Sequence, residues 1–169
     1  MAYITVILDA SHNRKDFSCG KSMLDNYLHK QVSQDIKRKL SVCFVLPDAE
    51  NEETIKGYYT LSNDTVPLEI IPEDIRKRMP PSYINLPTTL LGRLAVDSKF
   101  MKQGIGELLL LDALKRSYDY SKNIGSFAVI VDPLDMDAEN FYLKYGFIKL
   151  PDSGKMFLLM ATIAQIFKE

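Results

Sequence analysis

The chain has 169 residues, of which 46% are hydrophobic, 25% charged and 10% aromatic, and its formal net charge is -1. This length and composition predict a single globular domain with a sizeable core and argue against a disordered chain. Because 21 Lys and Arg stand against 22 Asp and Glu, the chain lacks the general basic excess of a dedicated nucleic-acid binder. A polyanionic partner would have to meet a local basic patch.

Several classes of protein are excluded by what the sequence lacks. Apolar runs such as Leu108–Leu111 are too short for a transmembrane helix, and the first residues have the pattern of a strand and not of a signal peptide. The only cysteines, Cys19 and Cys43, lie in unlike contexts, which excludes a disulfide scaffold and favours the cytoplasm. With only two histidines and no close Cys or His pairs, a structural zinc site is not expected.

The first third of the chain predicts a strand, a helix and a hairpin. Tyr3–Leu8 is β-rich, and apolar residues at helical spacing predict a helix over Met23–Arg38, with Ser22 as its N-cap. Strands are expected at Val42–Leu46 and Ile55–Ser62, paired across a polar turn.

The middle of the chain predicts an insertion and then a strand followed by a long helix. The stretch Pro67–Pro87 is rich in proline and charge and contains a short helix, Pro72–Arg78. Thr88–Val96 is strongly β-like, and Gly104–Ser121 predicts an amphipathic helix. The apolar face of that helix is expected to comprise Ile105, Leu108, Leu109, Ala113 and Leu114.

The last third alternates again between strands and helices. A helix capped by Asp135 or Asp137 is expected to run through Lys144 and to end at Gly146. The remaining predicted elements are strands at Phe127–Val131, Phe147–Leu150 and Lys155–Met160 and a short helix at Ile163–Phe167. This interleaving predicts an α/β (α+β) fold built on one mixed sheet, in a single domain spanning residues 1–169.

A glycine-containing loop at the start of the long helix is the first candidate site. Gly104 and Gly106 let the backbone approach a ligand closely, while the free N–H groups of the first helical turn attract an anion such as a diphosphate. The pattern is not a Walker loop, because Gly-Lys-Ser/Thr is missing, and it lacks the third glycine of a dinucleotide fingerprint. Taken alone, a Gly-x-Gly pattern at a helix start more often reflects packing or helix capping than a ligand site.

The second candidate segment is Ala138–Phe147. Phe141 and Tyr145 at helical spacing are most simply core residues, with Gly146 as the helix stop, and Tyr142 fits a half-buried aromatic residue with a satisfied hydroxyl.

Together and in this order, the two segments resemble the GNAT superfamily of acetyl-CoA-dependent N-acetyltransferases. Leu94-Ala95-Val96 with Met101-Lys102-Gln103-Gly104-Ile105-Gly106 is similar to that family's splayed strand and pyrophosphate loop, and Asn140-Phe141-Tyr142 with Tyr145-Gly146-Phe147 is similar to its later motif. The resemblance implies a central mixed, mostly antiparallel sheet flanked by helices, with a splayed strand pair holding acetyl-CoA. One departure is Met101, which stands where the family usually has Gln or Arg and cannot donate a side-chain hydrogen bond.

The resemblance also assigns roles to residues. The backbone N–H of Val96 would face the thioester oxygen, and Tyr142 would protonate the leaving thiolate as a general acid. The residues implied in binding acetyl-CoA are Leu94, Ala95, Val96, Met101, Lys102, Gln103, Gly104, Ile105, Gly106, Glu107, Asn140 and Tyr145. No metal is implied, and Asp132, Asp135 and Asp137 are expected to end a strand and cap a helix.

A narrower likeness concerns the start of the chain. Phe17-Ser18-Cys19-Gly20 with Leu24-Asp25-Asn26-Tyr27-Leu28 resembles the opening of acetyltransferase toxins from bacterial type II toxin–antitoxin systems. This likeness implies acetylation of the α-amine of an aminoacyl-tRNA, a ribbon-helix-helix antitoxin as partner and a homodimer. An α-amine, whose pKa is about 7.7–8.0, needs no strong base near neutral pH, and no carboxylate of the sequence stands out as one.

The acceptor nevertheless stays open at this point. Candidate contacts to RNA phosphates are Arg93, Arg76, Lys77 and Arg78, together with Lys37-Arg38-Lys39, although basic residues at helix ends also simply complement the helix dipole. The alternatives are an N-acetyltransferase acting on a small amine or a protein amine, and a non-catalytic domain that binds acyl-CoA or a partner protein.

Overall fold

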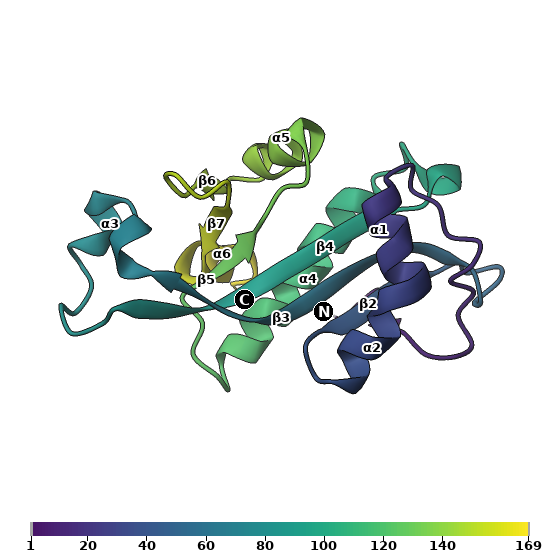
Figure 1. Cartoon of the computed structure of the whole chain (residues 1–169), viewed down its shortest axis with the longest axis horizontal. Coiled ribbons are helices and arrows are strands. Elements are labelled where there is room, and N and C mark those ends of the chain that lie inside the picture. The colour runs from purple at the N-terminus through teal and green to yellow at the C-terminus, as the bar shows by residue number, and fades with distance from the viewer. Residues whose placement is uncertain (1, 169) are drawn as a thin grey trace. The chain divides into compact units, whose positions relative to one another are not determined.

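The structure is a computed structural model that describes residues 2–168, and its strands form one seven-stranded sheet in the order β1-β2-β3-β4-β5-β7-β6 (Figure 1). The strands are β1 (Val6–Ile7), β2 (Val42–Pro47), β3 (Ile55–Pro67), β4 (Asn85–Val96), β5 (Ala128–Val131), β6 (Ile148–Lys149) and β7 (Met156–Leu159). The α-helices are α1 (Ser22–Asn26), α2 (Val32–Lys37), α3 (Glu73–Arg76), α4 (Ile105–Ser121), α5 (Met136–Lys144) and α6 (Met160–Ile166). Three further helical segments are a π-helix at Tyr27–Gln31 and 3-10 helices at Leu68–Ile70 and Ser98–Phe100. The predicted α/β class with a mostly antiparallel mixed sheet is confirmed.

The chain forms two compact units, which are described separately. The first comprises residues up to Ser62 together with Leu91–Arg116, and the second comprises Asn63–Leu90 together with the residues from Ser117 onward. The long strands β3 and β4 contribute to both units.

In the first unit, the predicted hairpin is confirmed. β2 pairs antiparallel with β3, placing Val45 opposite Tyr58 and Phe44 opposite Tyr59, and β1 adds to the outer edge of β2 through Val6 and Ile7. Of the predicted strand Tyr3–Leu8, only Val6–Ile7 is in the ladder.

Two consecutive tyrosines show that both faces of β3 are covered. Side chains alternate between the faces of a strand, so Tyr58 and Tyr59 point to opposite sides. The Tyr58 hydroxyl donates to the Leu24 carbonyl on the α1 side (2.7 Å), and the Tyr59 hydroxyl donates to Asp112 of α4 (2.7 Å). Both rings are fully buried. In Figure 1, α1 and α2 accordingly lie in front of β2 and β3, and α4 passes behind.

The helix predicted over Met23–Arg38 is confirmed in extent but not in form. Helical residues run from Ser22 to Lys37, and the middle of the segment, Tyr27–Gln31, is a π-helix. The prediction of Ser22 as N-cap is wrong, because Lys21 holds that position without a side-chain bond. Asp25 instead accepts the N–H of Cys19 (2.8 Å), so its carboxylate fixes the preceding loop.

The apolar face of α4 differs from the prediction at one residue. Ile105, Leu109, Ala113 and Leu114 are buried as expected, but Leu108 is 48% exposed and Leu110 is buried in its place. The buried face of the helix therefore extends from Leu109 to the side of Leu110 and not to the side of Leu108.

The second unit is built on β5, which is buried at every residue. β5 pairs parallel with β4 and antiparallel with β7, and β7 pairs with β6. Its core comprises Val66, Ile71, Leu86, Ala128, Ile130, Leu150 and Phe157. The predicted strands and helices of this region are present with boundaries shifted by a few residues, and Asp135 caps α5 by accepting the N–H of Ala138 (2.9 Å). Among the described residues, no helix is both long and apolar enough to cross a membrane.

Candidate functional site

The amino terminus of α4 presents backbone donors to solvent. The first helical hydrogen bond runs from the Leu108 N–H to the Gly104 carbonyl (3.2 Å), so the N–H groups of Ile105, Gly106 and Glu107 find no acceptor within the described chain. Gly104 has a positive φ of 75°, a backbone conformation that glycine adopts freely. The long helix adds its dipole to these donors, and the turn is suited to a diphosphate.

The loop ahead of this turn is held by Asp97, a residue to which the sequence analysis assigned no role. Its side chain is 4% exposed, and its carboxylate accepts the N–H groups of Lys99 (2.9 Å) and Ser18 (3.1 Å). The backbone adds bonds from the Asp97 N–H to the Lys56 carbonyl (2.8 Å) and from the Ser98 N–H to the Ser18 carbonyl (2.8 Å). The only signal in the sequence is an Asp directly before a short helical turn, a typical cap.

Side chains of the same loop point to solvent. Met101 is 46% exposed, and Lys102 and Gln103 are also exposed. Lys102 has a positive φ of 62°, which lets the chain turn sharply into the helix. Met101 has no side-chain donor, so the groups of this loop that could meet an anion are its backbone N–H groups and the Lys102 charge.

The preceding strand departs from its neighbour before it reaches this loop. β4 pairs with β5 only at Thr89 and Leu90, and the part of β4 from Leu91 onward has no partner in β5. Of the predicted cofactor contacts in this part of β4, Ala95 is buried, while Leu94 and Val96 are half-buried. The interrupted ladder fits the expected splayed strand.

A glycine of β3 sets how closely α4 approaches the sheet. A Cβ at Gly57 would lie 2.7 Å from Leu109 Cδ1 and 2.9 Å from the Ala95 carbonyl oxygen. The second contact is to backbone, which cannot move aside as a side chain can.

Gly57→Ala should therefore lower the free energy of unfolding by about 1–3 kcal/mol, since overpacking pushes both β4 and α4 away from β3. Urea denaturation measures this loss. Gly125→Ala is the matched control, because a Cβ at Gly125 meets nothing within 4 Å. Equal stability of the two variants would show that the close approach is not needed.

Tyr142 lies in the second unit on α5. It is 7% exposed, and its ring packs against Phe141 (centroids 5.3 Å apart) and Phe147 (5.2 Å). Burial raises the pKa of its hydroxyl well above the ordinary value, so the phenol stays protonated at neutral pH. The hydroxyl has no hydrogen-bond partner among residues 2–168, so the satisfied hydroxyl considered from sequence is not present, and the group can donate its proton to a ligand.

The neighbours of Tyr142 are less buried than the sequence indicated. Phe141 and Tyr145, expected in the core, are half-buried, and Asn140 is exposed. Gly146 ends the helix with a φ of 91°, as its position predicted.

The basic candidates fall into three places. Arg93 is half-buried, with its guanidinium 3.5 Å above the Tyr27 ring in the first unit, and the Tyr27 hydroxyl donates to Asp35 (2.9 Å). In the second unit, Arg76 donates to the Glu69 carbonyl (3.1 Å), whereas Lys77 and Arg78 are exposed. The exposed residues Lys37, Arg38 and Lys39 form the end of α2 and the turn after it.

Other chemistry is not supported by the described residues. Burial raises the pKa of Cys19 to about 11 and that of Cys43 to about 12, so neither thiol is a ready nucleophile. No group of three or more His, Cys, Asp or Glu residues is placed to hold a metal ion within residues 2–168.

Comparison with known proteins agrees with this geometry. The acetyltransferase (GNAT) domain matches residues 83–157. The tRNA-acetylating toxin of Mycobacterium tuberculosis (strain ATCC 25618 / H37Rv) is 34% identical over 145 residues, covering 85% of this chain and 84% of that protein. The probable toxin TacT of Sinorhizobium fredii (strain NBRC 101917 / NGR234) is 27% identical over 163 residues, covering 92% and 89%.

Solved structures of toxins are similar over nearly the whole chain. AtaT complexed with acetyl-methionyl-tRNAfMet superposes with a TM-score of 0.88 at 28% identity, covering 97% of this chain and 98% of that one. AtaTR bound with acetyl-CoA gives 0.85 at 28% identity, with 97% of each chain covered. A variant of AtaT bound to the C-terminus of the antitoxin AtaR and acetyl-CoA gives 0.81 at 25% identity, with 98% of each covered.

Proposed function

Because the chain belongs to the GNAT family of acetyltransferases and is related to its tRNA-acetylating toxins, we propose that it transfers the acetyl group of acetyl-CoA to the α-amine of an aminoacyl-tRNA. The observation that carries this proposal is the first turn of α4, whose free N–H groups fit the cofactor's diphosphate and lie in the segment that matches the family. The likeness to AtaT, which was solved with acetyl-methionyl-tRNA, supports the acceptor.

In the proposed reaction, the neutral α-amine attacks the thioester carbonyl carbon, and the carbon–sulfur bond breaks. The backbone N–H of Val96, at the end of β4, stabilises the charge that develops on the carbonyl oxygen. Tyr142, whose phenol is protonated at neutral pH, donates its proton to the departing thiolate. An α-amine, whose pKa is about 7.7–8.0, is partly neutral near pH 7 and needs no strong base before it attacks. Water accepts the proton that the nitrogen then releases, and the Tyr142 phenolate regains a proton from water at the end of the cycle.

The proposed cofactor contacts follow from the exposure of the loop. The N–H groups of Ile105, Gly106 and Glu107 bind the diphosphate, Lys102 supplies a positive charge, and the unpaired part of β4 lies along the rest of the cofactor. The side chains of Asn140 and Tyr145 are two further proposed contacts.

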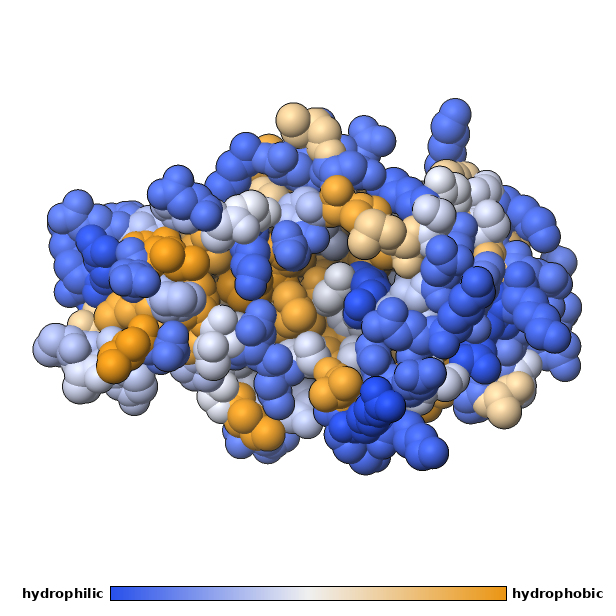
Figure 2. Space-filling view, viewed as in Figure 1, coloured by the Kyte–Doolittle hydropathy of each residue, from blue (hydrophilic) through white to orange (hydrophobic). Residues whose placement is uncertain are grey.

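A basic segment at the end of the first helical region is the proposed contact for tRNA phosphates. Lys30, Lys37, Arg38 and Lys39 are exposed there. The same region carries only two carboxylates, Asp25 and Asp35, against these four cations, so its net charge is positive. Figure 2 shows hydrophilic residues covering the region where Figure 1 draws α1 and α2.

The proposal extends to partners and place of action. A toxin of this type would be held inactive by an antitoxin, as AtaT is bound by the C-terminus of AtaR. It would act in the cytoplasm, where charged tRNA is found, and as a homodimer.

Incubating the protein with labelled acetyl-CoA and total charged tRNA tests the acceptor directly. Label is expected on charged tRNA and not on tRNA stripped of its amino acids. Label that appears only on small amines or protein would assign the acetyltransferase a different acceptor, and an absence of CoA release with every amine would remove the enzymatic proposal.

Changing Lys37, Arg38 and Lys39 together to alanine should lower kcat/KM for charged tRNA by about tenfold at low salt, because each lost phosphate contact weakens binding. The slope of log(kcat/KM) against log[salt] should become shallower by about 0.7–0.9 for each contact removed.

The Kd for acetyl-CoA should stay unchanged, and Lys122→Ala, a change at an exposed lysine just after α4, serves as the control. Should the triple variant keep the wild-type slope while an Arg76, Lys77 and Arg78 triple variant has a shallower one, the phosphate contact would lie at the C-terminal end of α3 and the residues directly after it.

A further inference from the structure

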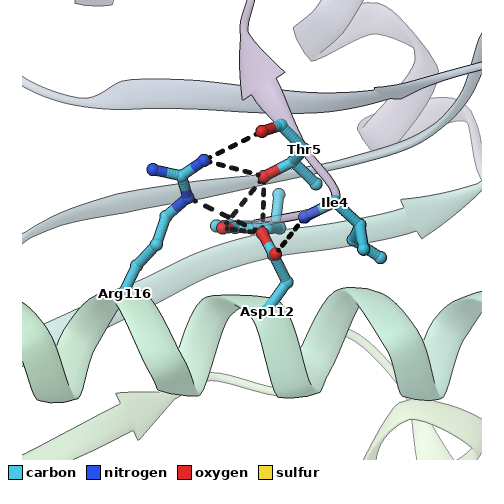
Figure 3. Close-up of polar contacts among 5 residues, drawn as sticks. Ile4, Thr5, Asp112 and Arg116 are labelled. Atoms are coloured by element: carbon cyan, nitrogen blue, oxygen red, sulfur yellow. Dashed lines mark hydrogen bonds and ion pairs between the residues drawn. The ribbon is translucent and has the colours of Figure 1, made fainter. Parts of the chain in front are cut away.

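A buried polar cluster ties the start of the chain to the helix that carries the proposed diphosphate site. It comprises Ile4, Thr5, Tyr59, Asp112 and Arg116, and all of these residues belong to the first unit (Figure 3). We call it the Asp112 cluster. None of its members is among the predicted site residues.

Asp112 accepts hydrogen bonds at both carboxylate oxygens and is only 4% exposed. Oδ1 accepts the backbone N–H of Ile4 (2.8 Å). Oδ2 accepts the hydroxyls of Thr5 (2.5 Å) and Tyr59 (2.7 Å). One side chain of α4 therefore holds both the first residues of the chain and the strand β3.

Arg116, one turn further along α4, completes the attachment. Its Nη2 donates to the Thr5 carbonyl (3.0 Å) and hydroxyl (3.2 Å), and its Nε lies 3.6 Å from Asp112 Oδ2. The guanidinium also sits 3.9 Å from the ring centroids of both Tyr3 and Phe44. Charge, hydrogen bonds and cation–π contacts thus converge on a single helix face.

This attachment costs more than an apolar contact would. A buried carboxylate and a guanidinium lose their hydration, and a well-packed apolar pair at the same positions is often equally stable. What the ionic cluster adds is direction, since hydrogen bonds to Ile4, Thr5 and Tyr59 fix the rotation of α4 about its axis, whereas apolar packing tolerates sliding.

The geometry points to Asp112 as a positioning residue for acetyl-CoA binding, acting by fixing the orientation of the first turn of α4. The inference rests on the proposed cofactor site at that turn. Asp112 lies six residues beyond Gly106, a helical distance of about 9 Å. A tilt of only about 6° at the cluster would move the first turn by about 1 Å, and misplacements of that size can cost about 100-fold in rate.

The first measurement is the Kd for CoA by calorimetry on variants that circular dichroism shows to be folded. Asp112→Asn should raise the Kd about tenfold and Thr5→Val about threefold, because the first turn loses its fixed direction. Val32→Ala is the matched control: Val32 is fully buried in the same unit, in a core cluster with Phe17, Leu28 and Tyr58 that includes no member of the Asp112 cluster. It should lower the free energy of unfolding in urea but leave the Kd within about twofold.

A second readout separates positioning from mere stability. In amide NMR spectra without ligand, the signals of Gly104 and Gly106 should shift in Asp112→Asn and stay in place in Val32→Ala. An Asp112→Asn protein that binds CoA like the wild type, or a Val32→Ala protein that loses equal affinity, would overturn the inference. If Asp112→Asn does not fold, Thr5→Val decides by the same two measurements.

A failure of the positioning role of Asp112 can be distinguished from a wrong assignment of the cofactor site itself. If Gly106→Asp binds CoA normally, the site assignment is wrong whatever Asp112 does. If Gly106→Asp loses CoA while Asp112→Asn and Thr5→Val keep it, the site stands and only the positioning role is overturned.

Discussion

Tyr142→Phe is expected to lower kcat by about 10²- to 10⁴-fold, the range that a general acid contributes, while acetyl-CoA affinity stays nearly unchanged. The change removes one oxygen from a ring that is buried against Phe141 and Phe147. Because the hydroxyl has no hydrogen-bond partner among the described residues, its loss breaks no bond of the fold. Stability should therefore be preserved, and the loss should appear in turnover alone.

Single-turnover assays and calorimetry on the same preparation measure the two quantities. Tyr120→Phe is the matched control, since Tyr120 is a tyrosine of α4 that is 61% exposed, and it should behave as the wild type. Full turnover by Tyr142→Phe would remove this residue from the proposed chemistry.

Gly106→Asp should weaken acetyl-CoA binding by about 100-fold or more, because it sets a carboxylate against the two phosphate charges. The same change should leave the free energy of unfolding unchanged or raise it by about 0.3–1 kcal/mol, since an acidic residue in the first turn complements the helix dipole. Binding and stability are thus expected to move in opposite directions, which a general folding defect cannot imitate.

Two controls divide the effect into its parts. Gly106→Ala adds the Cβ without the charge and shows how closely the cofactor approaches the backbone. Gly125→Asp adds the same charge where a Cβ has open space, and it should bind acetyl-CoA normally. Calorimetric binding of acetyl-CoA to Gly106→Asp with wild-type affinity would place the diphosphate elsewhere.

The fold was predictable where local signals and burial agree. The hairpin of β2 and β3, the long α4 after a glycine loop, and the Asp135 cap of α5 all follow from short-range chemistry. The family was also predictable, because the segments Leu94–Gly106 and Asn140–Phe147 match its two motifs in the expected order.

Long-range polar contacts were not predictable in the same way. Asp112 and Arg116 look like ordinary charged positions on a surface helix, yet Thr5 and Ile4 lie more than a hundred residues away in the chain, and their hydrogen bonds bury Asp112. Asp97 is a similar case, since its partner Ser18 is distant in sequence. The predicted N-cap, Ser22, is wrong by one residue, because the helix begins at Ser22 itself and Lys21 precedes it as the N-cap.

The π-helical turn at Tyr27–Gln31 lets the segment hold one more residue than a regular α-helix of the same length. Because the wider turn takes up that residue, the segments before and after it stay in phase: Val32 lies in the core, and Lys37, Arg38 and Lys39 are exposed. Inserting or deleting a residue in the regular helix α2 would have no such compensation, and every later position would rotate by about 100°. In this region the number of residues, as much as their identity, decides which surface the protein offers to an acceptor.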